Sequence, residues 1–308
     1  MDRMDDLNST NTTLSDELDR AEGYLMQGED EAAHDLLAHL AEDVEQYVDA
    51  NCPTTDDVQY FAFPTMFERL AYRRVEDDPR ELVRVGEPFG RVYADLALAC
   101  VRLEDYEAAI EALKMAVRWN PMDCASRLNL AELFLHTGDA QEYLALTYSV
   151  FDRASRAEDL ARAFLNFSGY FEANGQQRET AAALRAARRL GVDDTSLAAA
   201  FDQAAGTDHD PDSVTDDECQ ELLAAQGLPD GANAEIAICL LMCATDAAAA
   251  GNRAAATNLT IRARDLVGDA ACKALLQLIH ETDSEDAAPA AAGATETPAA
   301  TDGEAQDA

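Results

Sequence analysis

The sequence predicts an all-α fold of stacked helical hairpins, and three observations indicate it. Between Arg91 and Pro121, apolar side chains recur at helical spacing in two segments that Glu104-Asp105 separates. The pattern returns along the chain, with Gly138 standing 34 residues after Glu104 at the equivalent turn. Glycine (15 of 308 residues) and proline (9) are sparse, which favours helices over a β-sandwich. Because one hairpin cannot bury its apolar face alone, we expect the hairpins to stack.

The stretch from 91 to 121 contains two predicted helices, each with one apolar face. Small alanines on both faces allow the helices to approach closely. Pro121 ends the second helix because proline lacks the amide proton that a continuing helix needs. The two faces comprise Tyr93, Leu96, Ala97 and Cys100, and then Ala109, Leu113 and Ala116.

Further copies of this hairpin lie on both sides of the first. A second copy turns at Gly138, and a third turns at Gly175, 37 residues later. The segment from Leu14 to Leu40, with a turn at Gly28, is a degenerate copy. The helices before the second and third turns carry Leu130, Ala131 and Phe134, and then Phe164, Phe167, Ser168 and Phe171.

These copies resemble tetratricopeptide repeats (TPRs) in their period, in the aromatic Tyr93, in the alanines that follow and in the closing Pro121. The resemblance implies a right-handed α-solenoid of antiparallel helical hairpins. It also implies a non-enzymatic adaptor that binds a peptide or helix of a partner protein. The sequence leaves the partner and the oligomeric state open.

The chain divides into six predicted segments. Ser15 is the expected N-cap of the first helix, and Thr215 with Glu218 forms a capping box for a later one. A C-terminal hairpin is expected to turn at Gly251. The segments are a disordered N-terminus (1–13), an N-terminal helical region (14–85), the central TPR-like array (86–205), an acidic linker (206–214), a C-terminal helical region (215–280) and a disordered tail (281–308).

The densest aromatic cluster follows the helix-start signal at 54–57 and is predicted to lie on one helix. Pro64 should kink or split that helix. We interpret the cluster as core that joins the N-terminal hairpin to the repeats, with a partner-binding patch as the alternative. Its members are Tyr60, Phe61, Phe63, Met66, Phe67, Leu70 and Tyr72.

The net charge of −37, from 60 acidic and 23 basic residues, argues against nucleic acids and anionic membranes as partners. Two interpretations of the charge stay open: an acidic assembly chaperone for a basic client, or solubility and salt tolerance. The chain shows no apolar signal segment and no apolar run long enough to span a membrane. Its seven cysteines are an odd number, which fits free thiols better than a disulfide framework. We therefore expect a cytoplasmic protein with free thiols.

We find no motif for catalysis and expect no cofactor or metal. Asp208–Asp212 begins like a calcium loop, but Ser213 and Cys219 stand where that loop needs glycine and glutamate. Cys239 and Cys243 lie one helical turn apart without the second ligand pair that structural zinc needs. An enzyme or metal sensor in the C-terminal helical region remains a further alternative.

The resemblance also implies a concave groove lined by the first helix of each hairpin. Ala94 and Leu98 replace the lysine and asparagine with which some TPR proteins clamp chaperone tails, so that clamp is absent. Arginines among leucines would make the groove locally positive, unless they pair with acidic neighbours. The groove positions are Arg91, Ala94, Leu98, Val101 and Arg102; Ala125, Leu128, Glu132, Leu135 and His136; and Arg162, Leu165, Gly169, Glu172 and Ala173.

Overall fold

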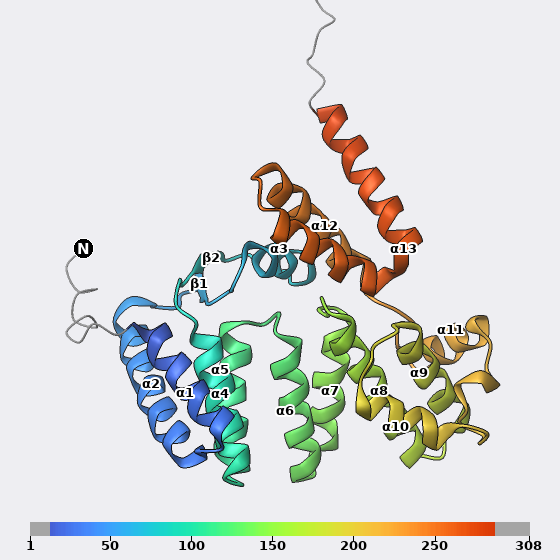
Figure 1. Ribbon diagram of the computed structural model, residues 1–308, viewed down its shortest axis with the longest axis horizontal. Helices are drawn as coiled ribbons and strands as arrows, with labels where there is room; N and C mark the ends of the chain where they lie inside the picture. The colour runs from blue at the N-terminus through green and yellow to red at the C-terminus, as the bar shows by residue number, and fades with distance from the viewer. Residues whose placement is uncertain (1–12, 287–308) are drawn as a thin grey trace, which may run out of the picture.

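Helices dominate the computed structural model of the protein, which describes residues 13–286 (Figure 1). The described part contains thirteen α-helices, one short 3-10 helix and two short strands. The prediction of a mostly helical protein is thus confirmed. The disorder expected over 1–12 and 287–308 lies outside the described residues.

Four helical hairpins follow one another along the chain. Within each hairpin the two helices pack together, and the second helix packs against the first helix of the next hairpin, as α2 does on α4, α5 on α6 and α7 on α8. Predicted apolar faces provide these contacts. The pairs are α1 (Leu14–Gln27) with α2 (Asp30–Asn51), α4 (Phe89–Arg102) with α5 (Tyr106–Trp119), α6 (Cys124–Thr137) with α7 (Ala140–Phe151), and α8 (Ala157–Ala173) with α9 (Gln177–Arg189).

The turn inside each hairpin contains a residue with left-handed backbone conformation. Gly28, Gly138 and Gly175 have φ angles of 74°, 91° and 71° at three of these turns. Glycine suits them because it has no Cβ to clash. Glu104, with φ of 63°, occupies the fourth turn and is the non-glycine residue with positive φ in the described chain.

A second layer covers the opposite ends of the hairpins, where one pair connects to the next (Figure 1). It contains β1 (Val58–Phe61), α3 (Met66–Val75) and β2 (Glu81–Arg84), followed much later in the chain by α12 (Ala234–Ala249) and α13 (Arg253–Asp286). The strands pair in parallel, with Val58 beside Glu81, and α3 connects them. Helix α12 packs against α3.

The helix predicted over the aromatic cluster is wrong in its first half. Residues 58–61 form a strand, and α3 begins only at Met66, after an N-cap at Thr65. Pro64 explains the break because it disfavours helical backbone at the residue before it. The cluster does form core: the rings of Phe61 and Phe63 stack 4.8 Å apart, and both are buried.

Arginine side chains tie the second layer to the hairpins. Arg118 of α5 donates to the carbonyl of Tyr60 at 2.9 Å, and Arg262 of α13 donates to the carbonyl of Ser155 at 3.2 Å. Their guanidinium groups also lie over aromatic rings, Arg118 over that of Trp119 at 4.6 Å. These arginines of an acidic chain therefore stabilise contacts between its own elements.

The residues after α9 fold back onto it. They form α10 (Thr195–Ala204), the 3-10 helix η1 (Pro211–Ser213) and α11 (Asp216–Ala225), which has the predicted Thr215 capping box. The segment 206–214 is not an extended linker, because Pro211 and Val214 are buried and η1 packs against α9. Within the segment, Asp210 also accepts hydrogen bonds from the N–H groups of Gly206 and Asp212, at 2.7 and 2.8 Å.

Two predicted boundaries need correction. Thr13, not Ser15, is the N-cap of α1, since its side chain accepts from Asp16 and completes a capping box. Helix α13 continues through residues 281–286, which were expected to belong to the disordered tail. Gly268, with φ of 82° and ψ of 162°, interrupts α13 and separates its two halves.

Candidate partner-binding face

The predicted groove residues lie on α4, α6 and α8, the first helices of three consecutive hairpins. Leu98 is 42% exposed on α4 and Leu135 is 49% exposed on α6. Arg91, Ala125, Glu132, His136, Gly169, Glu172 and Ala173 are also exposed. We call the exposed side of α1, α4, α6 and α8 the first-helix face.

Other predicted groove residues belong to the core. Leu128 is fully buried, because α8 packs against α6 beside it. Ala94, Val101 and Leu165 are half-buried against neighbouring core clusters. Leu128 is therefore a packing residue and is not available to a partner, which corrects the groove assignment at that position.

All three groove arginines form ion pairs with carboxylates. Arg91 pairs with Glu22 of α1, Arg102 pairs with Asp30 at 3.0 Å, and Arg162 pairs with Glu132 at 2.7 Å. Arg102 also donates to the carbonyl of Leu25 at 2.5 Å. The groove arginines therefore pair with acidic neighbours, which was the alternative to a groove that is locally positive. These ion pairs join α1 and the start of α2 to α4, and α6 to α8.

The sequence reasoning missed two features of this face. Met26 of α1 is 88% exposed. Asp95 of α4 lies against Glu22 of α1, and its Oδ2 atom is buried without a hydrogen-bond partner in the described chain. Burial, then the charge of Glu22, raises the pKa of Asp95 to about 7, while Arg91 opposes the shift. Helical spacing could have indicated Asp95, which stands four residues after Arg91.

His136 has a packing role at the edge of the face. Its ring lies 4.4 Å from that of Tyr106, measured between ring centres, and so joins α6 to the start of α5.

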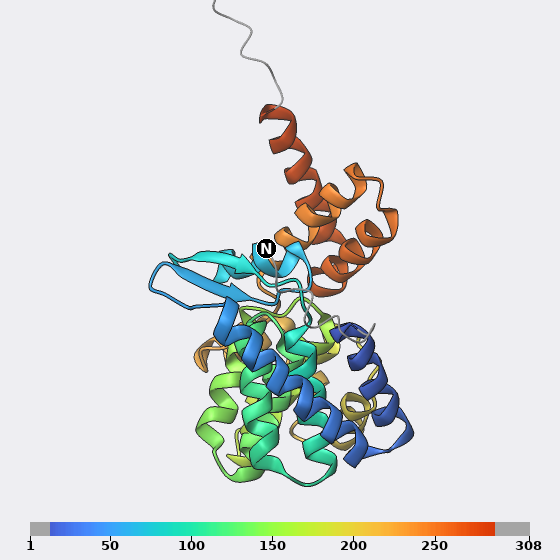
Figure 2. The same ribbon diagram turned by 90° about the vertical axis from the view of Figure 1, so that its left-hand side faces the viewer.

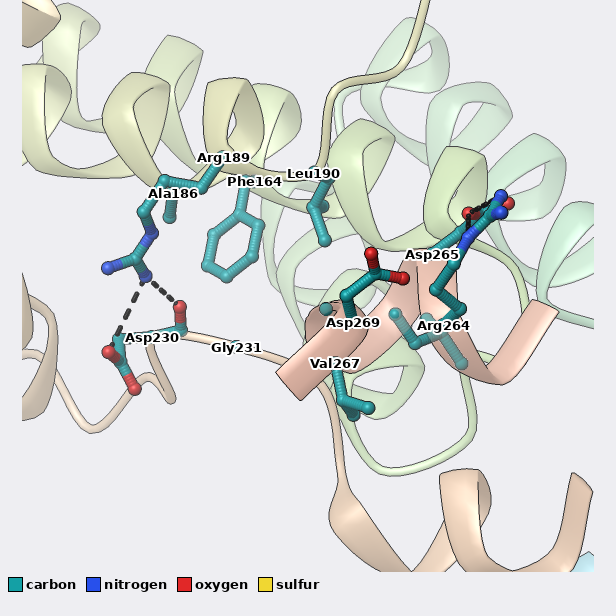
Figure 3. A pocket seen from close by; sticks show the side chains of 12 residues that line it. Phe164, Ala186, Arg189, Leu190, Asp230, Gly231, Arg264, Asp265, Val267 and Asp269 are labelled. Carbon is teal, nitrogen blue, oxygen red and sulfur yellow. Dashed lines mark hydrogen bonds and ion pairs between the residues drawn. The ribbon is translucent and has the colours of Figure 1, made fainter. Parts of the chain in front are cut away.

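A cavity of about 520 Å³ lies where the end of α9, the loop at 230–231 and the kink of α13 meet (Figure 3). Phe164 and Leu190 form the apolar part of the cavity wall. Arg189 donates to the carbonyl of Asp230, and Arg264 lies 2.6 Å from Asp265. Since these guanidinium groups already pair with carbonyl and carboxylate oxygens beside them, we assign no ligand to this cavity.

The cysteine pair of α12 is part of the core. Cys239 is buried, and burial raises the pKa of its thiol to about 11. A thiol with that pKa stays protonated at neutral pH and is a poor metal ligand. Among the described residues, no group of three or more histidine, cysteine or acidic side chains is placed to hold a metal ion.

Within the part of the chain that the structure describes, no helix is long and apolar enough to cross a membrane. Comparison with models of protein families yields no match for the chain. Comparison with curated proteins yields no match either.

Proposed function

We propose that the chain is a TPR-like adaptor whose first-helix face binds a peptide or helix of another protein. The 34-residue interval between the turns at Glu104 and Gly138 supports this proposal. The packing of each second helix on the next first helix supports it too, since that order of contacts is typical of stacked repeats.

The distribution of exposed apolar side chains carries the proposal. One large apolar side chain that is more than a third exposed lies on each of the four first helices. On the second helices α2, α5, α7 and α9, only Tyr148 is comparably exposed. Single exposed apolar residues are ordinary, but their recurrence on each of the four first helices favours an interaction surface along these helices, and we call the four side chains the apolar row. The row consists of Met26, Leu98, Leu135 and Tyr170.

The ion pairs of this face suit such a role because they hold the first helices at fixed positions. A partner segment would then bury the apolar row, with a few central anchors contributing most of the affinity. Leu98 is the best candidate for such an anchor, since it lies on α4 between the pairs of Arg91 and Arg102.

The net charge of −37 favours a second function, that of an acidic chaperone for a basic client protein. The two functions differ in what holds the partner. Binding through charge weakens steeply as salt is added, whereas burial of apolar surface does not.

Affinity capture with wild type, Leu98→Glu and Tyr148→Glu tests the adaptor at low and high salt. Tyr148 is the matched control because it is similarly exposed (46%) but lies on a second helix. The adaptor predicts partners that Leu98→Glu loses and Tyr148→Glu keeps, at both salt concentrations. Partners that all three proteins lose equally with salt would instead support the acidic chaperone.

A further inference from the structure

The outward side of α3 carries positive charge in a strongly acidic chain. The helix buries Phe67 and Ala71 in the core. Met66, Arg69 and Arg73 are spaced by three and four residues and lie on the opposite side of the helix. Met66 is 59% exposed, Arg69 is half-buried and Arg73 is exposed. An apolar side chain and two guanidinium groups therefore share one accessible stripe.

A third arginine, Arg84 of β2, lies at the beginning of this stripe. Side chains alternate along a strand, so Arg84 lies on the same face of β2 as Leu82, which packs in one core cluster with Phe67 of α3. Arg84 donates to the carbonyls of Phe63 and Pro64, each at 2.8 Å, just before α3 begins. Figure 2 shows the two strands standing out from the helices at the left of the view. We define the α3 patch as Met66, Arg69, Arg73 and Arg84.

The three arginines of the α3 patch form no ion pair within the described chain, whereas most other exposed arginines pair with a carboxylate. Arg73 donates to the carbonyls of Asp78 and Arg80, at 3.4 and 3.1 Å. Arg69 has no hydrogen-bond partner among the described residues, and Asp77 is exposed without pairing to Arg73. Carbonyl oxygens hold a guanidinium in place but do not neutralise its charge, so these groups keep both charge and free N–H donors.

We propose that the α3 patch binds an acidic segment of another protein, one in which carboxylates flank a single apolar side chain. The arginines would pair with the carboxylates, and Met66 would contact the apolar side chain. A short segment suffices, because Met66 and Arg73 stand seven residues apart, about 10 Å along the helix. The α3 patch lies outside the first-helix face, so this proposal does not rest on the adaptor function.

Charge decides which anionic partner fits. A nucleic acid carries a charge at every phosphate and would be repelled by the rest of the chain, whose net charge is −37. A second copy of the chain brings the same net charge and is repelled as well. A short acidic segment meets the α3 patch alone, since salt at about 0.15 M screens charges more than about 8 Å away. The exposed Met66 also favours a peptide, because phosphate groups offer no apolar contact.

Fluorescence anisotropy with short labelled peptides tests the proposal on the full chain, at about 0.15 M salt. The probe carries one leucine with two glutamates on either side. One control peptide has glutamines in place of the glutamates, and another has serine in place of the leucine. We expect the probe to bind, the glutamine peptide to bind about tenfold more weakly and the serine peptide about threefold more weakly.

Protein variants locate the site. Arg69→Glu/Arg73→Glu should abolish binding of the probe, and Arg69→Gln/Arg73→Gln, a milder change that removes only the charge, should weaken it about tenfold. The matched control Arg20→Glu/Lys114→Glu makes the same change of net charge on α1 and α5, where each residue forms a weak exposed pair on its own helix. It should bind within about twofold of wild type, as should Leu98→Glu on the first-helix face. Circular dichroism checks that each variant is folded.

Any of five results would overturn the proposal. Equal binding of the glutamine peptide would show that carboxylates are not recognised, and unchanged binding by Arg69→Glu/Arg73→Glu would place the peptide elsewhere. A single-stranded oligonucleotide that binds as tightly as the probe, and is lost in the same variant, would assign the α3 patch to nucleic acid. A dimer in sedimentation velocity that this variant converts to monomer would identify a second copy as the occupant. Tighter binding of the probe by Glu296→Gln/Asp302→Asn/Glu304→Gln would identify the chain's own C-terminal residues.

Discussion

Asp95 of α4 and Glu22 of α1 face each other beside Arg91, and the buried Oδ2 atom of Asp95 has no donor within the described chain. Arg91 is committed to Glu22 and to Asp19. The junction between the first two hairpins therefore places two carboxyl groups together and favours a proton on one of them.

This junction predicts a stability that depends on pH. The pKa of Asp95 is raised from 3.8 to about 7, so the folded protein binds this proton more tightly than the unfolded chain does. Its contribution is fully present below about pH 4 and is lost as the pH rises through about 7. We expect the melting temperature of Asp95→Asn to exceed that of wild type by more at pH 8 than at pH 5.

Asp19→Asn is the control for this effect, because the Asp19 side chain is 68% exposed. Its pH profile should follow that of wild type. Asp159, whose pKa burial raises to about 6, contributes in the same direction and should be compared as Asp159→Asn. Parallel profiles for wild type and Asp95→Asn between pH 5 and 8 would contradict the prediction.

Replacing Glu104 by glycine should stabilise the protein. Glu104 has a φ of 63°, and a left-handed conformation costs a residue with a Cβ about 1 kcal/mol. Glycine removes that cost, although it makes the unfolded chain more flexible. We expect the free energy of unfolding, from denaturant titration, to rise by about 0.5–1 kcal/mol in Glu104→Gly. Gly138→Ala, at the equivalent turn, should lower the free energy of unfolding. A lower free energy of unfolding in Glu104→Gly than in wild type would argue against the left-handed conformation at this turn.

Leu128 and Leu98 should differ sharply when each is changed to alanine. Leu128 is fully buried, so Leu128→Ala should lower the free energy of unfolding by about 2–5 kcal/mol. Leu98 is 42% exposed, so Leu98→Ala should cost less than about 1 kcal/mol. Thermal unfolding of the two variants measures the difference, and similar losses would mean that Leu98 also belongs to the core.

The helices and their turns could be predicted from the sequence because they depend on local spacing. Gly138 and Gly175 mark turns through their own backbone preference, and apolar residues at helical intervals mark the faces. Strand β1 could not be predicted in this way. Its four residues read equally well as part of a helix, and its partner Glu81 stands 23 residues after Val58.

The candidate face was predictable only in part, for a related reason. The repeat pattern places Leu98 and Leu128 on first helices, but it does not say how closely the next helix approaches. The approach of α8 to α6 buries Leu128. Likewise, the partners of Arg91 and Arg102 lie on α1 and at the start of α2, some seventy positions earlier, where spacing along one helix gives no information.

The segment from 206 to 231, expected to begin with a linker, should resist proteolysis. Its carboxylates pair with arginines of α9, as Asp212 does with Arg188 at 2.5 Å and Asp216 with Arg185 at 2.7 Å. Such exposed pairs are individually weak, and the buried Cys219 and Leu223 add apolar packing.

We expect endoproteinase Asp-N to cut wild type slowly in this segment and Arg185→Glu/Arg188→Glu about tenfold faster, because cleavage requires local opening. Arg264→Glu should match wild type there, since Arg264 pairs only with the adjacent Asp265 in the described chain. Rapid cleavage of wild type between 206 and 214 would mean that this segment is a linker after all.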